Sequence, residues 1–380
     1  MTTTPEYISN SEARRIILAA QGLHKANPFG SGTSGMIRTI EHLGYVQIDT
    51  ISVVERAHHH VLWSRNPRFA SDWLHRAQLK SRKIFEYWSH AAAYLPMKDY
   101  RYSLPVMDIF RSKKDRWPQS SKADMKKVMQ RIREEGPLLS RDFESDHKSG
   151  TWWDWKPDKW ALQRLYLEGH LMVSHREGFQ RVYDFPENII PPGTDITTPS
   201  REEYYSFLIL NTLKAQGLAS RTELFHLRHI DHPPFDQVLQ ALKEEQKIIP
   251  VKTAGQKLMF TLPEYLNKKT RLQEKITILS PFDNSVIWRN RLKDIFDFSY
   301  TLECYLPQAK RQYGYFCLPV LYKDKFIGRL DAKADRKKSE LQVNKMFWEN
   351  KGDQKDLKAL FTEALQSYAR FNLCEQVRLL

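Results

Sequence analysis

A repeated order of structural elements is the sequence feature that most constrains this fold. The segments LYLEGHLMVSHREGFQRVYDFPE (Leu165–Glu187) and LKEEQKIIPVKTAGQKLMFTLPE (Leu242–Glu264) end alike, on Phe/Leu-Pro-Glu. Each predicts a helix end, a strand, a glycine-containing turn and a second strand. Upstream of each, GPLLSRDFE (Gly136–Glu144) and QGLASRTELF (Gln216–Phe225) place a serine where it can cap a helix start. Helix, turn, helix, helix and β-hairpin is the order of a winged helix-turn-helix, and the chain is predicted to repeat it.

Helical periodicity supports this arrangement at three places in the chain. Apolar residues at the i, i+3, i+4, i+7 spacing indicate a helix with one buried face. The three sets are Ala13, Ile16, Ile17 and Ala20; Met125, Val128, Met129 and Ile132; and Phe235, Val238, Leu239 and Leu242. The N-terminal region fits a third, diverged unit, with helices over residues 12–21 and 34–43. Its hairpin strands are expected at GYVQID (residues 44–49) and VLWSR (residues 61–65).

The pattern changes from Leu279 onward. YTLECYLPQ, YGYFCLPVLY and KFIGRLDAKAD alternate apolar and polar residues and predict strands of a small β domain. A closing amphipathic helix is predicted from Leu357, Leu360, Phe361, Ala364, Tyr368 and Phe371. The expected fold class is therefore α+β, with tandem winged helix-turn-helix units before the β domain. The predicted divisions, in chain order, are winged helix 1 (1–66), a helical connector (67–119), winged helix 2 (120–190), winged helix 3 (198–266), the β domain (275–349) and the C-terminal helix (350–380).

The charge balance narrows the class of partner. The 59 Lys and Arg residues exceed the 45 Asp and Glu residues, so the formal net charge is +14. This surplus predicts a polyanionic partner, nucleic acid first, although basic proteins also bind membranes and acidic proteins. No stretch approaches the ~20 apolar residues of a membrane span, and the first residues lack the apolar core of a signal peptide. Three cysteines without a C-x-x-C pair argue against disulfides and a cysteine-based zinc site. We expect an intracellular protein that is not bound to a membrane.

The histidine run is the first candidate for chemistry. On a strand, at most His58 and His60 point to the same face, and no H-E-x-x-H or paired-cysteine motif completes a ligand set. We therefore expect no metal and no cofactor. Because Arg56 and Arg65 stand nearby, the stretch is predicted to touch phosphates through Arg56, His58, His60 and Arg65.

Other motifs are less specific. FGSGTSGM resembles G-x-G-x-x-G, but no hydrophobic strand precedes it, so we interpret it as a turn before a helix. DAKADRKK is either a solvated turn or a loop that contacts phosphates through Lys333, Arg336 and Lys337. WWDW (residues 152–155) fits packing better than base stacking. No G-x-x-x-x-G-K-[ST] or G-x-S-x-G motif is present.

YVQIDTI (Tyr45–Ile51) is unusual for a protein that attracts phosphate. Alternation on a strand places Tyr45, Gln47 and Asp49 on one face. An acidic group that faces DNA weakens binding unless a cation such as Arg56 pairs with it. A cap or a salt bridge is one explanation of Asp49, and catalysis is the other.

The order of motifs resembles that of the AlkZ/YcaQ-type winged-helix DNA glycosylases. The likeness rests on GYVQIDTISVVERAHHHVLWSR near the N-terminus and on SPFDNSVIWRNRL, AKRQYGYFCLPVLY and GRLDAKADRKK near the C-terminus, and it covers nearly the whole chain. It implies tandem winged helices followed by a β-barrel-like domain, in a C-shaped DNA-binding channel. Gln47-Ile48-Asp49 matches the Gln-apolar-Asp signature of the YcaQ-like branch, where the AlkZ branch has Gln-apolar-Gln.

By that resemblance the chain is a monofunctional glycosylase. Its substrates would be cationic N7-alkylated purines and interstrand crosslinks through N7 of guanine, and its products would include abasic sites. Asp49 would stabilise an oxocarbenium-like sugar and activate water, while Gln47 positions the water or the sugar. The implied partner is double-stranded DNA with these lesions, bound by a monomer in the cytoplasm at the nucleoid. The rival interpretations are a non-catalytic winged-helix regulator and a scaffold for other repair proteins.

Overall fold

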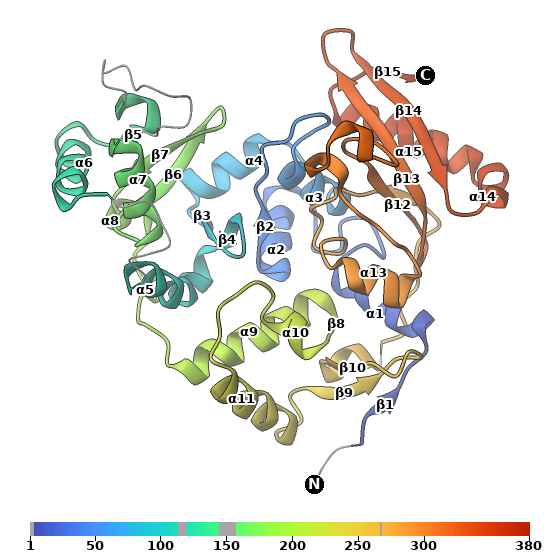
Figure 1. Cartoon of the computed structure of the whole chain (residues 1–380), viewed down its shortest axis with the longest axis horizontal. Coiled ribbons are helices and arrows are strands. Elements are labelled where there is room, and N and C mark those ends of the chain that lie inside the picture. Colours follow the sequence, from blue (N-terminus) through green and yellow to red (C-terminus); the bar gives the residue numbers. More distant parts are fainter. Residues whose placement is uncertain (1–3, 113–119, 144–156, 267) are drawn as a thin grey trace. The chain divides into compact units, whose positions relative to one another are not determined.

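The computed structural model describes residues 4–112, 120–143, 157–266 and 268–380. The chain divides into two compact units, one of Met1–Phe69 with Tyr205–Leu380 and one of Ala70–Tyr204. The fold is mixed α+β, as predicted (Figure 1). Among the described helices, none has the length and apolar character needed to cross a membrane. The WWDW segment lies outside the described residues.

The second unit contains the predicted winged helix of residues 120–190. Its helices and strands follow in the expected order. They are α6 (Lys122–Glu135), β5 (Leu138–Leu139), the 3-10 helix η3 (Ser140–Phe143), α7 (Pro157–Leu167), β6 (Met172–Glu177), β7 (Gln180–Asp184) and α8 (Pro186–Ile189). β6 and β7 form an antiparallel hairpin, and β5 pairs with β7. Val128 and Ile132 of the periodic set are buried in the core of this unit.

The segment of residues 67–119, predicted as a helical connector, contains a strand pair as well as helices. It contains α4 (Asp72–His75), the π-helix η1 (Arg76–Lys80), β3 (Ile84–Trp88), β4 (Ala92–Pro96), the 3-10 helix η2 (Met97–Ser103) and α5 (Leu104–Ser112). β3 and β4 form a hairpin, and β3 pairs with β6 at Glu86 and Val173. The buried Glu86 carboxylate accepts hydrogen bonds from Arg176 and Arg181, which compensates the cost of burying its charge.

The predicted winged helix of residues 198–266 also has its expected element order. It consists of α9 (Arg201–Gln216), β8 (Leu218–Ala219), α10 (Arg221–Leu224), α11 (His232–Glu244), β9 (Ile249–Lys252), β10 (Leu258–Thr261) and α12 (Pro263–Leu266). Ser220 caps α10, as its position in the repeat predicted, and Glu223 completes a capping box by accepting the Ser220 N–H at 2.7 Å. β1 (Glu6–Tyr7) adds a parallel strand to β9.

The N-terminal region has the predicted helices but not the predicted hairpin. α1 (Asn10–Ala20) and α2 (Gly32–Leu43) match the two expected helices. Of the glycine-rich segment, residues 29–31 precede α2 and residues 32–36 form its first turn. Of the two predicted hairpin strands, the first is present as β2 (Val46–Gln47), whereas residues 61–65 lie in α3 (Ala57–Arg65). Buried Ala57, Val61 and Arg65 follow a helical spacing. The prediction missed this spacing because it treated the histidines and residues 61–65 as separate segments.

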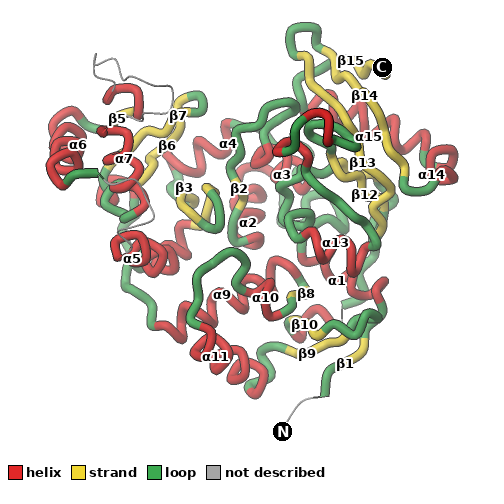
Figure 2. Tube along the Cα trace, viewed as in Figure 1, coloured by secondary structure: helices red, strands yellow, loops and turns green. Residues whose placement is uncertain are grey.

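The C-terminal sheet is curled, with the strand order β11-β12-β13-β14-β15 (Figure 2). Its strands are β11 (Ile276–Ile278), β12 (Leu318–Tyr322), β13 (Lys325–Asp335), β14 (Glu340–Trp348) and β15 (Gln376–Leu379). α13 (Arg289–Phe296) and the 3-10 helices η4 (Glu303–Tyr305) and η5 (Gln308–Lys310) lie between β11 and β12. YTLECYLPQ is therefore not a strand. β15, which pairs with β14 in parallel, was not predicted.

The predicted C-terminal helix is divided into α14 (Lys351–Asp356) and α15 (Lys358–Phe371). Ala364, Leu365 and Tyr368 of α15 lie in one buried cluster with apolar residues of the sheet. Val54 and Ala57, from the segment after β2, belong to the same cluster. The curled sheet and the N-terminal region therefore share a core, and this core supports the segment that carries Gln47 and Asp49.

Candidate functional site

The Gln-Ile-Asp segment follows directly from a helix end that needs glycine. Gly44 ends α2 with φ of 76°, in the left-handed region, and a Cβ there would lie 2.4 Å from the side-chain nitrogen of Asn211. The chain then enters β2, in which Val46 is buried, and Ile48 directly after it is buried too. Gln47 is buried as well, with 9% exposure, whereas Asp49 is half-buried. The two polar side chains therefore differ more in exposure than strict alternation predicts.

The Asp49 carboxylate is held by its own backbone. Its Oδ1 accepts a hydrogen bond of 2.8 Å from the N–H of Ile51, an arrangement known as an Asx turn. Burial raises the pKa of Asp49, and the hydrogen bond from Ile51 opposes that rise. A carboxylate with a raised pKa is a better proton acceptor, which suits a general base.

The charge of Asp49 also acts on a second segment, which is distant in sequence. Burial and the negative charge of Asp49 both raise the pKa of Cys304 and the pKa of Tyr305. These residues belong to η4, in the stretch that was expected to be a strand. This electrostatic link to Asp49 was not predicted, because it depends on how the loop between β11 and β12 folds.

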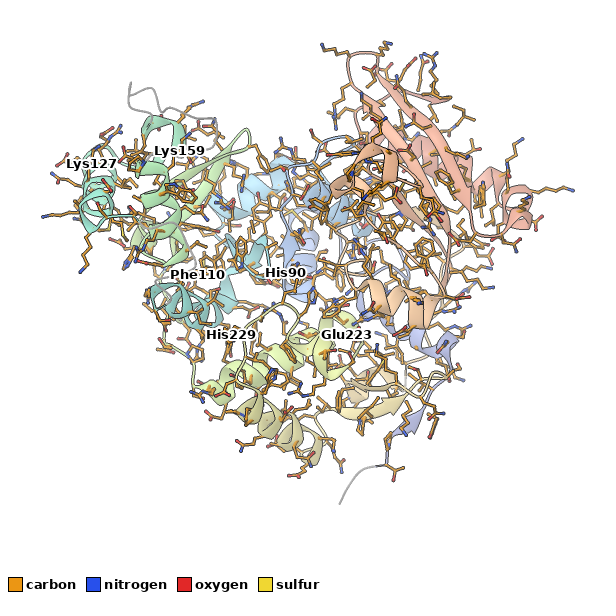
Figure 3. The ribbon with its side chains drawn as sticks, viewed as in Figure 1. His90, Phe110, Lys127, Lys159, Glu223 and His229 are labelled. Carbon is orange, nitrogen blue, oxygen red and sulfur yellow. The ribbon has the colours of Figure 1, made fainter. Side chains whose placement is uncertain are left out.

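Asn284, in the SPFDNSVIWRNRL motif, anchors the Gln-Ile-Asp segment at its start. Its side-chain nitrogen donates to the Tyr45 carbonyl oxygen at 3.1 Å, and its own carbonyl oxygen accepts from Gln216 at 3.4 Å. Gln216 in turn accepts a 2.7 Å hydrogen bond from the buried Arg291, which also pairs with Glu223 (labelled in Figure 3). This network fixes the start of β2 in place.

Arg65 is not placed to contact phosphate, contrary to the sequence-based prediction. It is fully buried, and its guanidinium forms a two-pronged ion pair with Asp283, at 2.7 and 3.0 Å. It also donates to the Gln21 carbonyl oxygen at 2.7 Å. The Arg65 guanidinium holds the pKa of the buried Asp283 below its usual value, against the effect of burial. Arg65 therefore supports the fold behind the site.

His58 and His60 are also buried, and they lie on α3 rather than on a strand. The prediction that they touch DNA is therefore wrong. His60 Nε2 lies 2.9 Å from the Ile278 carbonyl oxygen. Burial lowers the pKa of His60 to about 4, so this ring is neutral at physiological pH. Within the described part of the chain, no group of three or more His, Cys, Asp or Glu side chains is arranged to hold a metal ion.

The other predicted DNA contacts remain at the surface or near it. Lys333 and Lys337 are exposed at the hairpin of β13 and β14. Arg336, in the same hairpin, lies 3.5 Å from Glu55, and the Ala334 N–H donates to the Val53 carbonyl oxygen at 2.9 Å. The basic hairpin is thereby joined to the loop that follows Asp49. Arg56 is half-buried at the N-cap of α3.

These motifs fall within a match to a known protein family. The family model described as "DNA glycosylase AlkZ-like" matches residues 40–371, which include Gln47, Asp49, Asn284 and the basic hairpin. The chain belongs to the AlkZ-like DNA glycosylase family. The resemblance inferred from the sequence is confirmed, and the family assignment supports an enzyme rather than a non-catalytic regulator.

The architecture agrees with this assignment. The chain is similar in structure to the DNA glycosylase AlkZ of Streptomyces sahachiroi, with a TM-score of 0.66 over 98% of this chain and 100% of that one. The two sequences are 16% identical, so the likeness establishes the shared fold. A DNA glycosylase acts on DNA, so DNA is the polyanionic partner that the positive net charge of this AlkZ-like protein predicted.

Proposed function

We propose that this AlkZ-like glycosylase excises cationic N7-alkylated purines and unhooks interstrand crosslinks formed through N7 of guanine. The observation that carries the proposal is Asp49, a half-buried carboxylate with a raised pKa beside a glutamine in a basic protein. In a protein that only binds DNA, this negative charge would repel the phosphates and weaken binding without any benefit. In a glycosylase, the same charge faces the positive charge that develops on the sugar.

The chemistry suits a site with one carboxylate. Alkylation at N7 leaves a positive charge on the purine, so the base departs without a general acid. As the C1′–N9 bond breaks, its electron pair passes to the purine, which becomes neutral, and the sugar becomes oxocarbenium-like. Water adds to C1′ and gives its proton to Asp49, so that an abasic site remains. We assign Gln47 to positioning this water or the sugar.

A lyase step is not part of the proposal. The segment Tyr45–Ile51 contains no lysine, so it offers no amine to form a Schiff base with the sugar. A crosslinked purine is tied to the opposite strand and leaves the base stack with difficulty. We therefore favour an approach to the sugar from the groove over extrusion of the base into a pocket.

The proposed partner is double-stranded DNA with alkylated or crosslinked purines, bound by one copy of the chain in the cytoplasm at the nucleoid. Lys333, Arg336, Lys337 and Arg56 are the proposed phosphate contacts. The exposure of Lys333, Arg336 and Lys337, and the link of their hairpin to the loop after Asp49, support this role.

The test is a panel of matched duplexes, each incubated with the protein under single-turnover conditions. One contains N7-methylguanine, one an N7-guanine interstrand crosslink and one undamaged guanine. We expect free base and alkali-sensitive sites from the first, separated strands from the second and no product from the third. Absence of release above the uncatalysed background on both damaged duplexes would overturn the proposal.

A further inference from the structure

The loop between β2 and α3 is tied to two segments that are distant in sequence. We call residues 48–56 the β2–α3 loop. The Val53 carbonyl oxygen accepts a 2.9 Å hydrogen bond from the Ala334 N–H, in the basic hairpin of β13 and β14. At the end of the loop, the Glu55 N–H donates to the side-chain oxygen of Asn372 at 2.6 Å. Asn372 follows α15 and is fully buried, so water does not compete for this second bond.

The two distant segments are also bonded to each other. The Glu375 N–H, just after α15, donates to the Ser339 carbonyl oxygen in the turn of the basic hairpin at 2.9 Å. The β2–α3 loop, the basic hairpin and the chain after α15 therefore form a closed triangle of hydrogen bonds (β13, β14 and α15 are labelled in Figure 1). A displacement of one side of this triangle is passed to the other two through these bonds.

The Glu55 side chain lies at the corner where the loop meets the hairpin. Its Oε1 accepts hydrogen bonds of 2.9 Å from the Arg56 N–H and from Nδ1 of His59, one turn along α3. Its Oε2 lies 3.5 Å from the Arg336 guanidinium. Burial raises the pKa of Glu55, but these hydrogen bonds and the charge of Arg336 hold it below its usual value. The group is therefore charged at neutral pH.

Arg336 can hold Glu55 and a phosphate at the same time. Its side chain is 36% exposed, and the contact with Glu55 is made through Nη2. A guanidinium carries five N–H donors in one plane, so pairing at Nη2 leaves donors on Nε and Nη1. Two such donors match the geometry of a phosphate group.

A negative charge at this corner weakens binding in a protein that only binds DNA. Glu55 lies beside the hairpin at which phosphates are proposed to bind, and its carboxylate repels them. A glutamine could accept the same two hydrogen bonds through its side-chain oxygen, so local folding does not require the charge. What the charge adds is the ion pair with Arg336.

We propose that Glu55 is a positioning residue, which links a phosphate contact at Arg336 to the placement of Asp49 at the sugar. The inference rests on the proposed function and deepens it. A phosphate held by Arg336 fixes the basic hairpin on the DNA backbone, and the Glu55 ion pair passes that position to the β2–α3 loop. Asp49 is held within the same loop by its hydrogen bond from the Ile51 N–H. Binding energy at the backbone is thereby used to orient the carboxylate at C1′.

This link predicts an effect on rate that a simple phosphate contact does not have. A side chain that only attracts phosphate stabilises the bound ground state and the transition state equally. Its loss weakens binding and leaves the saturating rate unchanged. A contact that orients Asp49 also changes the saturating rate, because a misplacement of about 1 Å costs about 10²-fold.

The experiment measures binding and chemistry separately for Glu55→Gln, Arg336→Gln and the double variant, each in the full chain. Chemistry is the saturating single-turnover rate on a duplex with one N7-methylguanine, and binding uses the same duplex with guanine. Glu55→Gln is expected to lower the rate by about 10- to 100-fold. Its binding should be unchanged or up to about threefold tighter, since a negative charge is removed.

Arg336→Gln is expected to lower the rate to a similar extent and to weaken binding as well, since it removes a phosphate contact. The double variant should lose no more rate than the more affected single variant, because both substitutions break the same link. Effects on binding should combine independently. This difference between rate and binding is not expected from a residue that only stabilises the fold.

Glu340→Gln is the matched control. Glu340 lies 3.7 Å from Arg378 in the same sheet, and its side chain is 20% exposed against 19% for Glu55. The substitution therefore removes the same charge from a similar ion pair that does not involve the β2–α3 loop. The saturating rate should stay within about twofold of that of the unmodified protein.

The results that would overturn the inference differ in scope. If the unmodified protein releases base but Glu55→Gln or Arg336→Gln keeps the saturating rate within about twofold, only the role of Glu55 fails. The same holds if the two rate losses multiply in the double variant. If the unmodified protein releases no base, the proposed function fails and the inference falls with it. Thermal unfolding establishes that each variant is folded, and the partly exposed Arg336 supplies the test if Glu55→Gln is unstable.

Discussion

Replacement of Asp49 by asparagine separates catalysis from binding. Asparagine has the same shape, and its Oδ1 can still accept the 2.8 Å hydrogen bond from the Ile51 N–H, so the local backbone is retained. Only the charge is lost. Because burial raises the pKa of Asp49, ionisation of this group opposes folding at neutral pH, and the neutral amide should leave stability equal or slightly higher.

Asp49→Asn is expected to lower the rate of base release but to raise the affinity for DNA. Loss of a general base and of its charge should slow base release by about 10²- to 10⁴-fold. For affinity, a carboxylate about 7 Å from a phosphate in water costs about 0.6 kcal/mol, so the variant should bind DNA up to about threefold more tightly. A variant that binds DNA equally well or more tightly but releases the base far more slowly identifies Asp49 as a catalytic carboxylate.

Single-turnover release of N7-methylguanine and a binding titration of the same duplex measure the two effects. Asp297→Asn is the control, because it removes one exposed negative charge from the same unit at a left-handed position that asparagine tolerates. It should leave the rate unchanged. A rate in Asp49→Asn within threefold of the unmodified protein would refute the catalytic role.

Three further predictions follow from the described contacts. Asp283→Asn leaves Arg65 buried without its carboxylate and should lower the free energy of unfolding by about 3–5 kcal/mol in urea denaturation; a loss below about 1 kcal/mol would contradict this. Lys333→Gln and Lys337→Gln should each flatten the slope of log K against log salt by about one, and unchanged slopes would exclude phosphate contacts. Because burial lowers the pKa of His60 from 6.5 to about 4, the unfolded chain takes up its proton first, so stability should fall as pH drops from about 6.5 to 4. Equal urea midpoints at pH 7.5 and 5 would be inconsistent with this buried, neutral ring.

Local periodicity predicted α1, α6 and α11, and the repeat predicted the element order of two of the three winged-helix units. Ala13, Ile17 and Ala20 are buried on α1, and Phe235 and Leu239 are buried on α11, as their spacing required. The tails that end on Pro-Glu fold as the expected strand pairs in both repeats. These features depend on neighbouring residues, which a sequence pattern records directly.

Features that depend on distant residues were missed or predicted wrongly. The strand assigned to residues 61–65 is helical, and Arg65 is buried because Asp283, far along the chain, pairs with it. A surface arginine and a buried one look the same in sequence until the partner is known. β15 (Gln376–Leu379) alternates polar and apolar residues over only four positions, a run too short to mark a strand until its pairing with β14 is known.

The site was predictable in part. The sequence placed Gln47 and Asp49 in a short strand; the structure keeps Gln47 in β2 and places Asp49 just after it. The structure adds the supports of this segment, namely the burial of Asp49 and the Asn284 bond to Tyr45. Asn284 lies in a motif that had already been singled out, whereas Tyr305 was assigned to a strand. Its electrostatic link to Asp49 depends on the fold of a long loop, which periodicity does not describe.

The most direct test of the account identifies the products from one duplex that contains a single N7-methylguanine. Free base is measured by chromatography with mass detection, and the abasic site by alkali cleavage, for the unmodified protein and for Asp49→Asn. The account predicts equal amounts of base and abasic site with the unmodified protein and neither above background with the variant. Strand cleavage without alkali, or equal release by both proteins, would contradict it.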